Sequence, residues 1–341
     1  MPDNRDPQRK PTLKTIAGLT GLAVPTVSRA LSGAEDISVD TRARVRAVAD
    51  EIGYVPNRAG VRLRTGRTNV ISLVMSTEHD IMNHTAKLIS SVAGGLRNTP
   101  FHLIITPYFI EEDPLKPIRY IVESGSADAV IFNQIQPRDP RIAYLLDRGF
   151  PFATHGRSEW SPQHAYFDFD NAAFGALAVR SLARRGRRRL ALIAPPVEQS
   201  YALAMIAGCR TEAEQQGVAF EVLAGISSDS PLEAMESRAA AFMSEPGACD
   251  GLIGGSTNSG LAAIAALEAC GRRLGQDVDV FTKEAIPFLR RVRPEILTIQ
   301  EDVSAAGHFL AQAAMARVRQ PDAPPMQHLD TPQDPLTQPE D

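Results

Sequence analysis

LKTIAGLTGLAVPTVSRALSG, residues 13–33, has the pattern of two short helices around a tight turn. Apolar residues recur at helical spacing on the first helix, Gly21 supplies the turn, and the stripe resumes on a second helix at Val24, Val27 and Leu31. Pro25 falls in the first turn of that second helix, where proline is tolerated because its missing N–H would lack a partner there anyway. The stretch therefore predicts a helix-turn-helix.

The outward face of the second helix carries short or basic side chains, namely Pro25, Thr26, Ser28 and Arg29. A helix of this size fits the major groove of DNA, where small side chains let the backbone approach and an arginine can bind guanine through two hydrogen bonds. The alternative is a helical hairpin inside an ordinary core. The forty residues that follow favour the DNA-binding interpretation.

A third helix is expected to close the core of this amino-terminal part. Ser38 is a suitable N-cap, and the inward stripe runs along Val45, Val48, Ala49 and Ile52. Arg42, Arg44 and Arg46 lie on the outer side, where they either reach the DNA backbone or form a solvated charged face. The next segment, residues 58–63, is too short to be a stable helix in isolation, so it is expected to fold on DNA. The alternative is that residues 58–67 are a basic linker with no structure of their own.

TLKTIAGLTGLAVPTVSRALSG, residues 12–33, and ISVDTRARVRAVADEIGYVPNRAGVRLRTGRT, residues 37–68, together resemble the DNA-binding headpiece of the LacI/GalR family of bacterial transcriptional repressors. The resemblance implies that residues 58–63 form a hinge helix that pairs with its twin in a homodimer. It also implies that Leu63 enters the minor groove as an apolar wedge and kinks the duplex. Gly60 stands where the family usually has alanine, and glycine costs about 1 kcal/mol relative to alanine in a helix.

The partner implied for this part is double-stranded operator DNA. Val24, Pro25, Thr26 and Arg29 are expected to read bases. The full set of expected DNA contacts is Thr12, Leu13, Val24, Pro25, Thr26, Ser28, Arg29, Asn57, Arg58 and Leu63, with Thr12, Ser28 and Asn57 holding phosphates.

From residue 70 onward, short apolar strands alternate with helical stretches in two successive cycles. Such alternation predicts parallel sheets covered on both faces, so the fold class is α + α/β, a headpiece followed by two doubly wound lobes of the periplasmic-binding-protein type. The expected division is a flexible leader 1–11, the headpiece 12–56, a hinge 57–68, a first lobe 69–166 plus 299–320, a second lobe 167–298, and a disordered, proline-rich tail 321–341. The tail has no heptads, so the expected assembly is a dimer.

Charge divides the chain in the same way. Residues 1–67 carry 12 Lys and Arg against 7 Asp and Glu, a net of +5, whereas the whole chain has −4. The basic end suits a polyanion. The sequence has no stretch of eighteen apolar residues and no early apolar run, so neither a membrane span nor a signal peptide is expected. We therefore expect a cytoplasmic location. Cys209, Cys249 and Cys270 lack the spacing of a metal or redox pair and are interpreted as idle thiols.

Ligands in parallel sheets collect at the carboxyl ends of the strands, where this sequence places polar side chains. We expect a carbohydrate effector there, between the two lobes, because its hydroxyls require paired donors and acceptors. The expected contacts are Glu78, Asn83, His84, Tyr108, Asn133, His155, Arg157, Met205, Ser256 and Glu284; further candidates at these ends are Asp80, Thr106, Gln134, Thr257 and Lys283.

This cleft departs from the family pattern. Met205 replaces the arginine that commonly precedes Leu-Ala-Gly, Ser256-Thr257 replaces Asn-Asp, and residues 282–285 read TKEA in place of Gly-Phe-Asp-Asp. EHDIMNHT (78–85), TPYF (106–109) and VFTKE (280–284) resemble the α-glucoside-operon repressors, which suggests a glucoside or related disaccharide. A phosphorylated sugar, a polyol or no small ligand remain alternatives.

Two other classes of protein compete with this hypothesis. The core alone resembles a sugar-binding receptor, but the basic headpiece argues against that class. An enzyme acting on a sugar could use Asp168, Asp170 and His155 as acid and base, yet the sequence has no nucleophile elbow, phosphate-binding glycine loop or metal-ligand spacing. No catalytic residue, cofactor or metal is therefore predicted.

Overall fold

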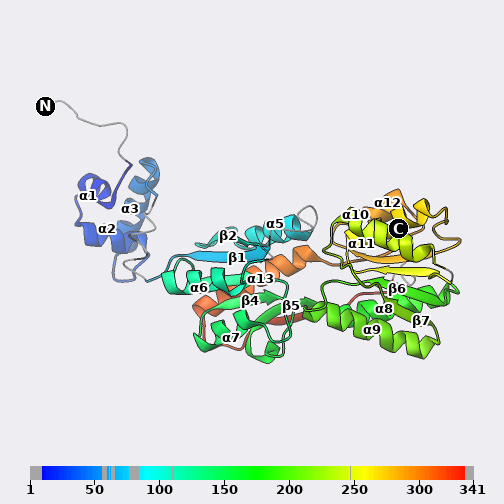
Figure 1. The fold of residues 1–341 in the computed structure, drawn as a ribbon. Helices are drawn as coiled ribbons and strands as arrows, with labels where there is room; N and C mark the ends of the chain where they lie inside the picture. Colours follow the sequence, from blue (N-terminus) through cyan, green and yellow to red (C-terminus); the bar gives the residue numbers. More distant parts are fainter. Residues whose placement is uncertain are drawn as a thin grey trace. The chain divides into compact units, whose positions relative to one another are not determined.

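The computed structural model describes residues 10–55, 60, 62, 66–76, 84–109, 111–245 and 247–334 (Figure 1). The chain forms two compact units, residues 1–68 and 69–341. Each unit is built around its own buried apolar residues, so each is described separately.

Within residues 10–55, the first unit forms three helices, α1 (Leu13–Thr20), α2 (Val24–Leu31) and α3 (Val39–Glu51). Thr12 caps α1 by accepting from the Thr15 amide, and Gly21 ends it with a φ of 71°, a left-handed conformation that glycine adopts without strain. Side chains from all three helices form one core, which contains Ile16, Val27, Ala30, Val45 and Ala49. The predicted helix-turn-helix and its third helix are confirmed.

Two of the α3 arginines bind the backbone of this unit. Arg42 Nη1 donates to the carbonyl oxygens of Gly33 at 3.1 Å and Ala34 at 3.3 Å, just beyond the end of α2. Arg44 Nη2 donates to the carbonyl of Thr20 at 3.1 Å, the last residue of α1. Helix ends leave carbonyls without intrahelical partners, and a cation is favourable there. These two arginines therefore tie α3 to the ends of the other two helices, a role that the sequence did not suggest.

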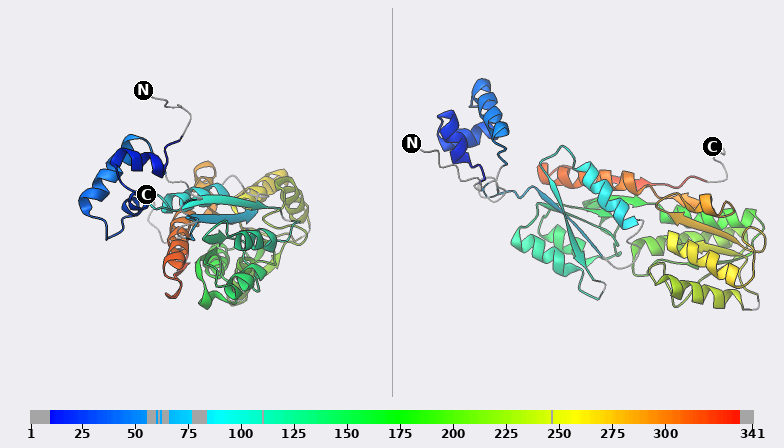
Figure 2. Two further views of the ribbon diagram at one scale, coloured as in Figure 1. Left: turned by 90° about the vertical axis from the view of Figure 1, so that its left-hand side faces the viewer. Right: turned by 90° about the horizontal axis from the view of Figure 1, so that it is seen from above.

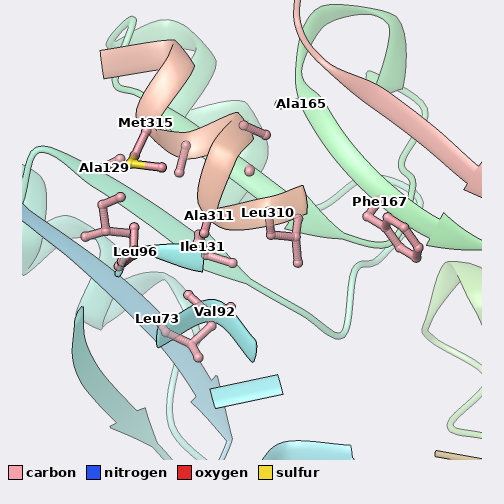
Figure 3. Packing of buried hydrophobic residues seen from close by; sticks show 14 of the residues in the cluster. Leu73, Val92, Leu96, Ala129, Ile131, Ala165, Phe167, Leu310, Ala311 and Met315 are labelled. Atoms are coloured by element: carbon pink, nitrogen blue, oxygen red, sulfur yellow. The ribbon is translucent and has the colours of Figure 1, made fainter. Parts of the chain in front are cut away.

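The first lobe of the second unit is a six-stranded parallel sheet in the order β11-β5-β4-β3-β1-β2. Its strands are β1 (Val70–Ser76), β2 (His102–Tyr108), β3 (Ala129–Phe132), β4 (Phe152–His155), β5 (Ala165–Phe169) and β11 (Gln327–Asp330). One face packs on α5 (Ala86–Gly95) and α13 (Val303–Arg319), which lie side by side (Figures 2 and 3). The other face packs on α6 (Leu115–Ser124) and α7 (Pro140–Asp147).

The second lobe is a five-stranded parallel sheet in the order β10-β9-β8-β6-β7. Its strands are β6 (Arg189–Ile193), β7 (Ala219–Val222), β8 (Gly251–Gly254), β9 (Asp279–Glu284) and β10 (Leu297–Gln300). The sheet is covered on one face by α8 (Asn171–Arg184) and α9 (Ser200–Gln216), and on the other by α10 (Leu232–Met243), α11 (Thr257–Ala269) and the short α12 (Leu289–Val292). The predicted fold class, with two parallel-sheet lobes, is confirmed.

The expected boundaries between the lobes were wrong by a few residues. A division after residue 166 cuts β5, which pairs with β4 in the first lobe, and a division after residue 298 cuts β10, which pairs with β9 in the second. The chain crosses between lobes after Phe169 and again after Gln300, and α13 then returns to the first lobe as predicted.

The prediction of a disordered tail was also wrong for its described part, which ends at residue 334. Residues 327–330 form β11, which pairs with β5, and the Asp170 amide donates to the Asp330 carbonyl at 2.7 Å. An edge strand is held by backbone hydrogen bonds, so it needs no apolar run, and the prolines that flank it make a strand hard to predict from the sequence.

Burial raises the pKa of the Cys209 and Cys249 thiols to about 12, in keeping with idle thiols. None of the described helices is both long and apolar enough to span a bilayer.

Candidate functional site

The first unit has a concave surface between the segment that precedes α1 and the outward side of α2. Five of the predicted DNA contacts line it together: Thr12, Leu13, Val24, Pro25 and Ser28. Lys10 and Lys14 lie on the same concave surface and add positive charge to it. Thr26 and Arg29 lie on α2 as predicted but are not among the described residues that line the concavity.

Arg29 forms an ion pair with Asp36, a residue of the loop between α2 and α3. Both side chains are about half exposed, so the pair is only weakly stabilising and either group can take another partner. Arg29 is therefore available to another partner at the surface of α2. Asn57, Arg58 and Leu63, predicted to hold phosphate and wedge the minor groove, lie outside the described residues.

The second unit has a cavity of about 140 Å³ at the carboxyl ends of both sheets. Polar residues from the two lobes and from the crossing segments dominate its lining: His84, Thr85, Asn133, Gln134, His155, Gly156, Asp168, Asn171, Tyr201, Ser228, Asp229, Gly255, Ser256, Thr257, Lys283, Glu284, Ala285 and Glu301. We call this cavity the interlobe cleft. It lies where parallel-sheet proteins usually bind ligands.

Glu301 is the centre of the charge network in the interlobe cleft. Its Oε1 lies 3.3 Å from His155 Nε2 and 3.6 Å from His84 Nε2, both from the first lobe, and its Oε2 lies 2.8 Å from Lys283 Nζ of the second lobe. Burial alone would raise the pKa of Glu301, but the Lys283 ammonium and the two histidines outweigh it and hold the pKa well below its usual value. Glu301 is therefore ionised and joins the two lobes electrostatically.

Lys283 contacts residues of both lobes and of the crossing segments. Its Nζ donates to Asn171 Oδ1 at 3.2 Å and lies 5.1 Å from the ring centre of Phe169 and 5.6 Å from that of Tyr201. These contacts, with Glu301, satisfy the ammonium group inside the protein. Lys283 is thus a paired cation and not one reserved for an anionic ligand.

The structure places five of the ten predicted effector contacts on the cleft: His84, Asn133, His155, Ser256 and Glu284. Two of them also have local structural roles. Ser256 caps α11 by accepting from the Ser259 amide, and Glu284 Oε2 accepts from the amides of Phe288 and Leu289 at 3.2 Å each. Asn133 differs, since its buried Oδ1 has no hydrogen-bond partner among the described residues. Glu78 and Asn83 lie outside the described residues.

Three predicted contacts do not line the cleft. Met205 is fully buried in the second-lobe core between α8 and α9, because it lies one turn beyond the cleft-lining Tyr201 on α9. The Tyr108 hydroxyl donates to Gln134 Oε1 at 3.1 Å, so Tyr108 contacts a residue that lines the cleft without lining it itself. Arg157 Nε pairs with Asp168 Oδ2 at 2.7 Å in the same way, although burial still raises the pKa of Asp168.

The sequence analysis missed Glu301 as a ligand-site residue because it missed β10. The run LTIQ, residues 297–300, is a short strand that ends directly before Glu301, so the rule of carboxyl ends would have found it. Tyr201, Asn171 and Asp229 were missed because helix starts and loops supply them. Among the described residues, His84, His155 and Glu301 are also the group whose ligand atoms could hold a metal ion.

Comparison with known families gives two matches. Residues 12–57 match the model of bacterial regulatory proteins of the lacI family, and residues 179–336 match the model of the periplasmic binding protein-like domain. The first match covers the three helices of the first unit, and the second covers most of the second lobe and its return through α13.

Similar curated proteins match over most of their length. The chain is 30% identical over 312 residues to the HTH-type transcriptional regulator AglR of Rhizobium meliloti (strain 1021), covering 88% of this chain and 86% of that protein. It is 32% identical over 282 residues to the HTH-type transcriptional regulator RafR of Escherichia coli, covering 81% of this chain and 82% of RafR.

Two solved structures share the fold. A complex of the transcriptional regulator CelR with cellobiose has a TM-score of 0.69 at 23% identity, covering 95% of this chain and 98% of that one. The lac repressor dimer bound to operator and the anti-inducer ONPF has a TM-score of 0.80 at 17% identity, and the match covers 95% of this chain and 97% of that one.

Proposed function

The chain belongs to the LacI family of bacterial transcriptional regulators. We propose that an uncharged sugar bound in the interlobe cleft controls its affinity for operator DNA. The regulator acts as a homodimer on a carbohydrate-utilisation operon, and its place of action is the cytoplasm, where that DNA lies. Residues 12–55 bind DNA, and the two lobes of residues 69–330 form the sensor.

The basic, concave surface of the first unit supports the DNA-binding half of this proposal. Val24, Pro25, Thr26 and Arg29 of α2 read bases in the major groove, and Thr12, Ser28 and Asn57 hold phosphates. Arg29 pairs with Asp36 at the surface, and a guanine edge replaces that exposed carboxylate when the complex forms. Leu63 wedges the centre of the operator.

The charges in the interlobe cleft favour an uncharged ligand over a phosphorylated one. Among the described lining residues, Lys283 is the single lysine or arginine, and it is already paired with Glu301. The other charged lining groups include the carboxylates of Asp168, Asp229 and Glu284, which repel an anion. Because the described lining of the cleft has many donors and acceptors and no spare lysine or arginine, a neutral sugar fits it best.

Asn133 lines the cleft, and its buried Oδ1 has no hydrogen-bond partner in the described part of the chain; this observation supports a sugar most strongly. A buried acceptor without a partner costs roughly 1–3 kcal/mol, and a ligand hydroxyl that donates to it recovers that loss. The Tyr201 ring lines the same cleft and supplies a flat apolar surface for a pyranose face. The CelR neighbour, which was solved with cellobiose, is consistent with this ligand class. An α-glucoside is the first candidate to test.

The binding test is a thermal-unfolding screen of the full chain. We expect maltose, cellobiose or raffinose at 100 times its dissociation constant to stabilise the protein by about 2.7 kcal/mol, whereas glucose 6-phosphate leaves it unchanged. Asn133→Ala should lower the affinity for the active sugar by up to about tenfold, which is the effect of one lost hydrogen bond. Gln215→Ala removes an exposed amide from α9 and should leave the affinity unchanged. A shift with the phosphorylated sugar alone would contradict the proposed ligand class.

A further inference from the structure

Three side chains from distant parts of the chain bring their ligand atoms together on one side of the interlobe cleft. His84 precedes α5, His155 ends β4, and Glu301 follows β10. Their ligand atoms all lie within 4.8 Å of one another, and both histidine Nε2 atoms lie 3.3–3.6 Å from the same Glu301 oxygen. The two imidazole rings are stacked, with 5.2 Å between centroids and 10° between planes.

The two distances from the histidine Nε2 atoms to Glu301 Oε1 match those between ligands of a small tetrahedral metal ion. With Zn–N and Zn–O bonds of about 2.0–2.2 Å, two ligand atoms of a tetrahedral site lie about 3.3–3.6 Å apart. Two imidazoles and one carboxylate are also a common set for zinc sites that keep one position open. Imidazole ligands select against Mg²⁺ and Ca²⁺, which prefer oxygen.

The surroundings favour an added positive charge. Lys283 contacts Glu301 through Oε2 alone, so Oε1 faces only the two histidines among the ion pairs of the described residues. The carboxylates of Asp168, Asp229 and Glu284 also line the cleft; Arg157 pairs with Asp168, and Lys283 is the one ammonium group of the described lining. A divalent cation on Oε1 brings the buried charges closer to balance.

We propose that His84 Nε2, His155 Nε2 and Glu301 Oε1 bind one transition-metal ion of the Zn²⁺ type in the interlobe cleft. The protein supplies three ligands, and the fourth position is open to water or to a ligand hydroxyl. The metal would join the first lobe to the segment that enters α13. This site goes beyond sugar sensing, because it can be measured without sugar or DNA.

The direct test is calorimetric titration of Zn²⁺ into the full-length protein, without a polyhistidine tag and after treatment with a chelator. We expect one equivalent to bind, Mg²⁺ not to compete, and Co²⁺ in place of Zn²⁺ to give the visible absorption of a tetrahedral site. His84 is the most exposed of the three ligands, at 25% of its side chain, so His84→Ala should fold. The substitution should lower the affinity for Zn²⁺ by more than the roughly 10–100-fold that is typical when a residue hydrogen-bonded to a metal ligand is lost.

The matched control is His102→Ala, which removes an exposed histidine from β2 and should leave Zn²⁺ affinity unchanged. Lys283→Met removes the competing cation and should tighten Zn²⁺ binding. Damage to the fold would instead weaken Zn²⁺ binding, so the two effects can be told apart. If the protein binds no Zn²⁺, or if Zn²⁺ binding persists unchanged in His84→Ala, the three groups form only an ion-pair network and the proposal is overturned. Weaker Zn²⁺ binding in a folded Lys283→Met protein would overturn it as well.

Discussion

Arg141→Met is expected to lower the free energy of unfolding of the first lobe by about 3–5 kcal/mol. Arg141 is 2% exposed and binds Asp139 through both Nε, at 2.9 Å, and Nη2, at 2.7 Å, while its guanidinium carbon lies 4.6 Å from the ring centre of Phe132. Methionine preserves much of the packing volume but leaves the fully buried Asp139 without its charge partner. An uncompensated buried charge is among the largest single costs in a folded protein.

Arg141 also supports one edge of the interlobe cleft. Its Nη2 donates to the carbonyl oxygens of Gln134 at 2.7 Å and Asn133 at 3.2 Å, and Gln134 has a φ of 55°, which a non-glycine residue adopts only when its surroundings hold it. We therefore expect Arg141→Met to weaken sugar binding in addition to lowering stability. Loss of stability without any change in sugar affinity would show that the loop after β3 does not depend on this arginine.

The measurement is urea unfolding followed by tryptophan fluorescence. Trp160 is the single tryptophan of the chain and packs on the same core cluster as Phe132, so its emission reports the first lobe. The matched control is Arg138→Met, because Arg138 pairs with Glu159 at 2.8 Å but both side chains are at least half exposed. Exposed pairs contribute about 0–1 kcal/mol, so a control as damaging as Arg141→Met would contradict the account.

Ser28→Glu is expected to reduce operator affinity by at least about 100-fold, the factor that corresponds to 2.7 kcal/mol. Ser28 lies within the concave surface that Lys10 and Lys14 share, on the side of α2 that we propose faces DNA. Glutamate there removes the proposed phosphate contact and adds a negative charge against the DNA backbone. Since the sugar site lies in the other compact unit, sugar affinity should be unchanged.

Ala47→Glu is the matched control for this prediction. It adds the same charge at an exposed position of α3, so its effect on operator affinity should be several-fold at most. The measurement is fluorescence anisotropy with labelled operator DNA at two salt concentrations. Equal losses in Ser28→Glu and Ala47→Glu would show that net charge, and not the α2 surface, determines binding.

The first unit could be predicted closely from the sequence because its signals are local. The Thr12 cap, the left-handed Gly21 and the apolar stripe through Ile16 and Val27 each act within a few residues. The pairing of Arg29 with Asp36 and the binding of Arg44 to Thr20 could not be predicted, because they depend on how the helices meet in space.

The interlobe cleft could be predicted in outline and not in detail. His84, Asn133 and His155 follow or end strands with clear apolar runs, and all three line the cleft. Met205 was placed by analogy to a family motif, but its own apolar character draws it into the core. Glu301 was missed because four residues of β10 carry too little pattern to reveal the strand that positions it.

The most direct test of the account is operator binding by the purified full-length protein with and without the sugar that raises its unfolding temperature. We predict specific binding to a fragment from its own promoter region in the presence of bulk genomic competitor, and a change in operator affinity of about 5–150-fold on adding the sugar. If no promoter fragment is preferred over bulk DNA, whether or not candidate sugars are present, the assignment of this chain as a sugar-controlled regulator is contradicted.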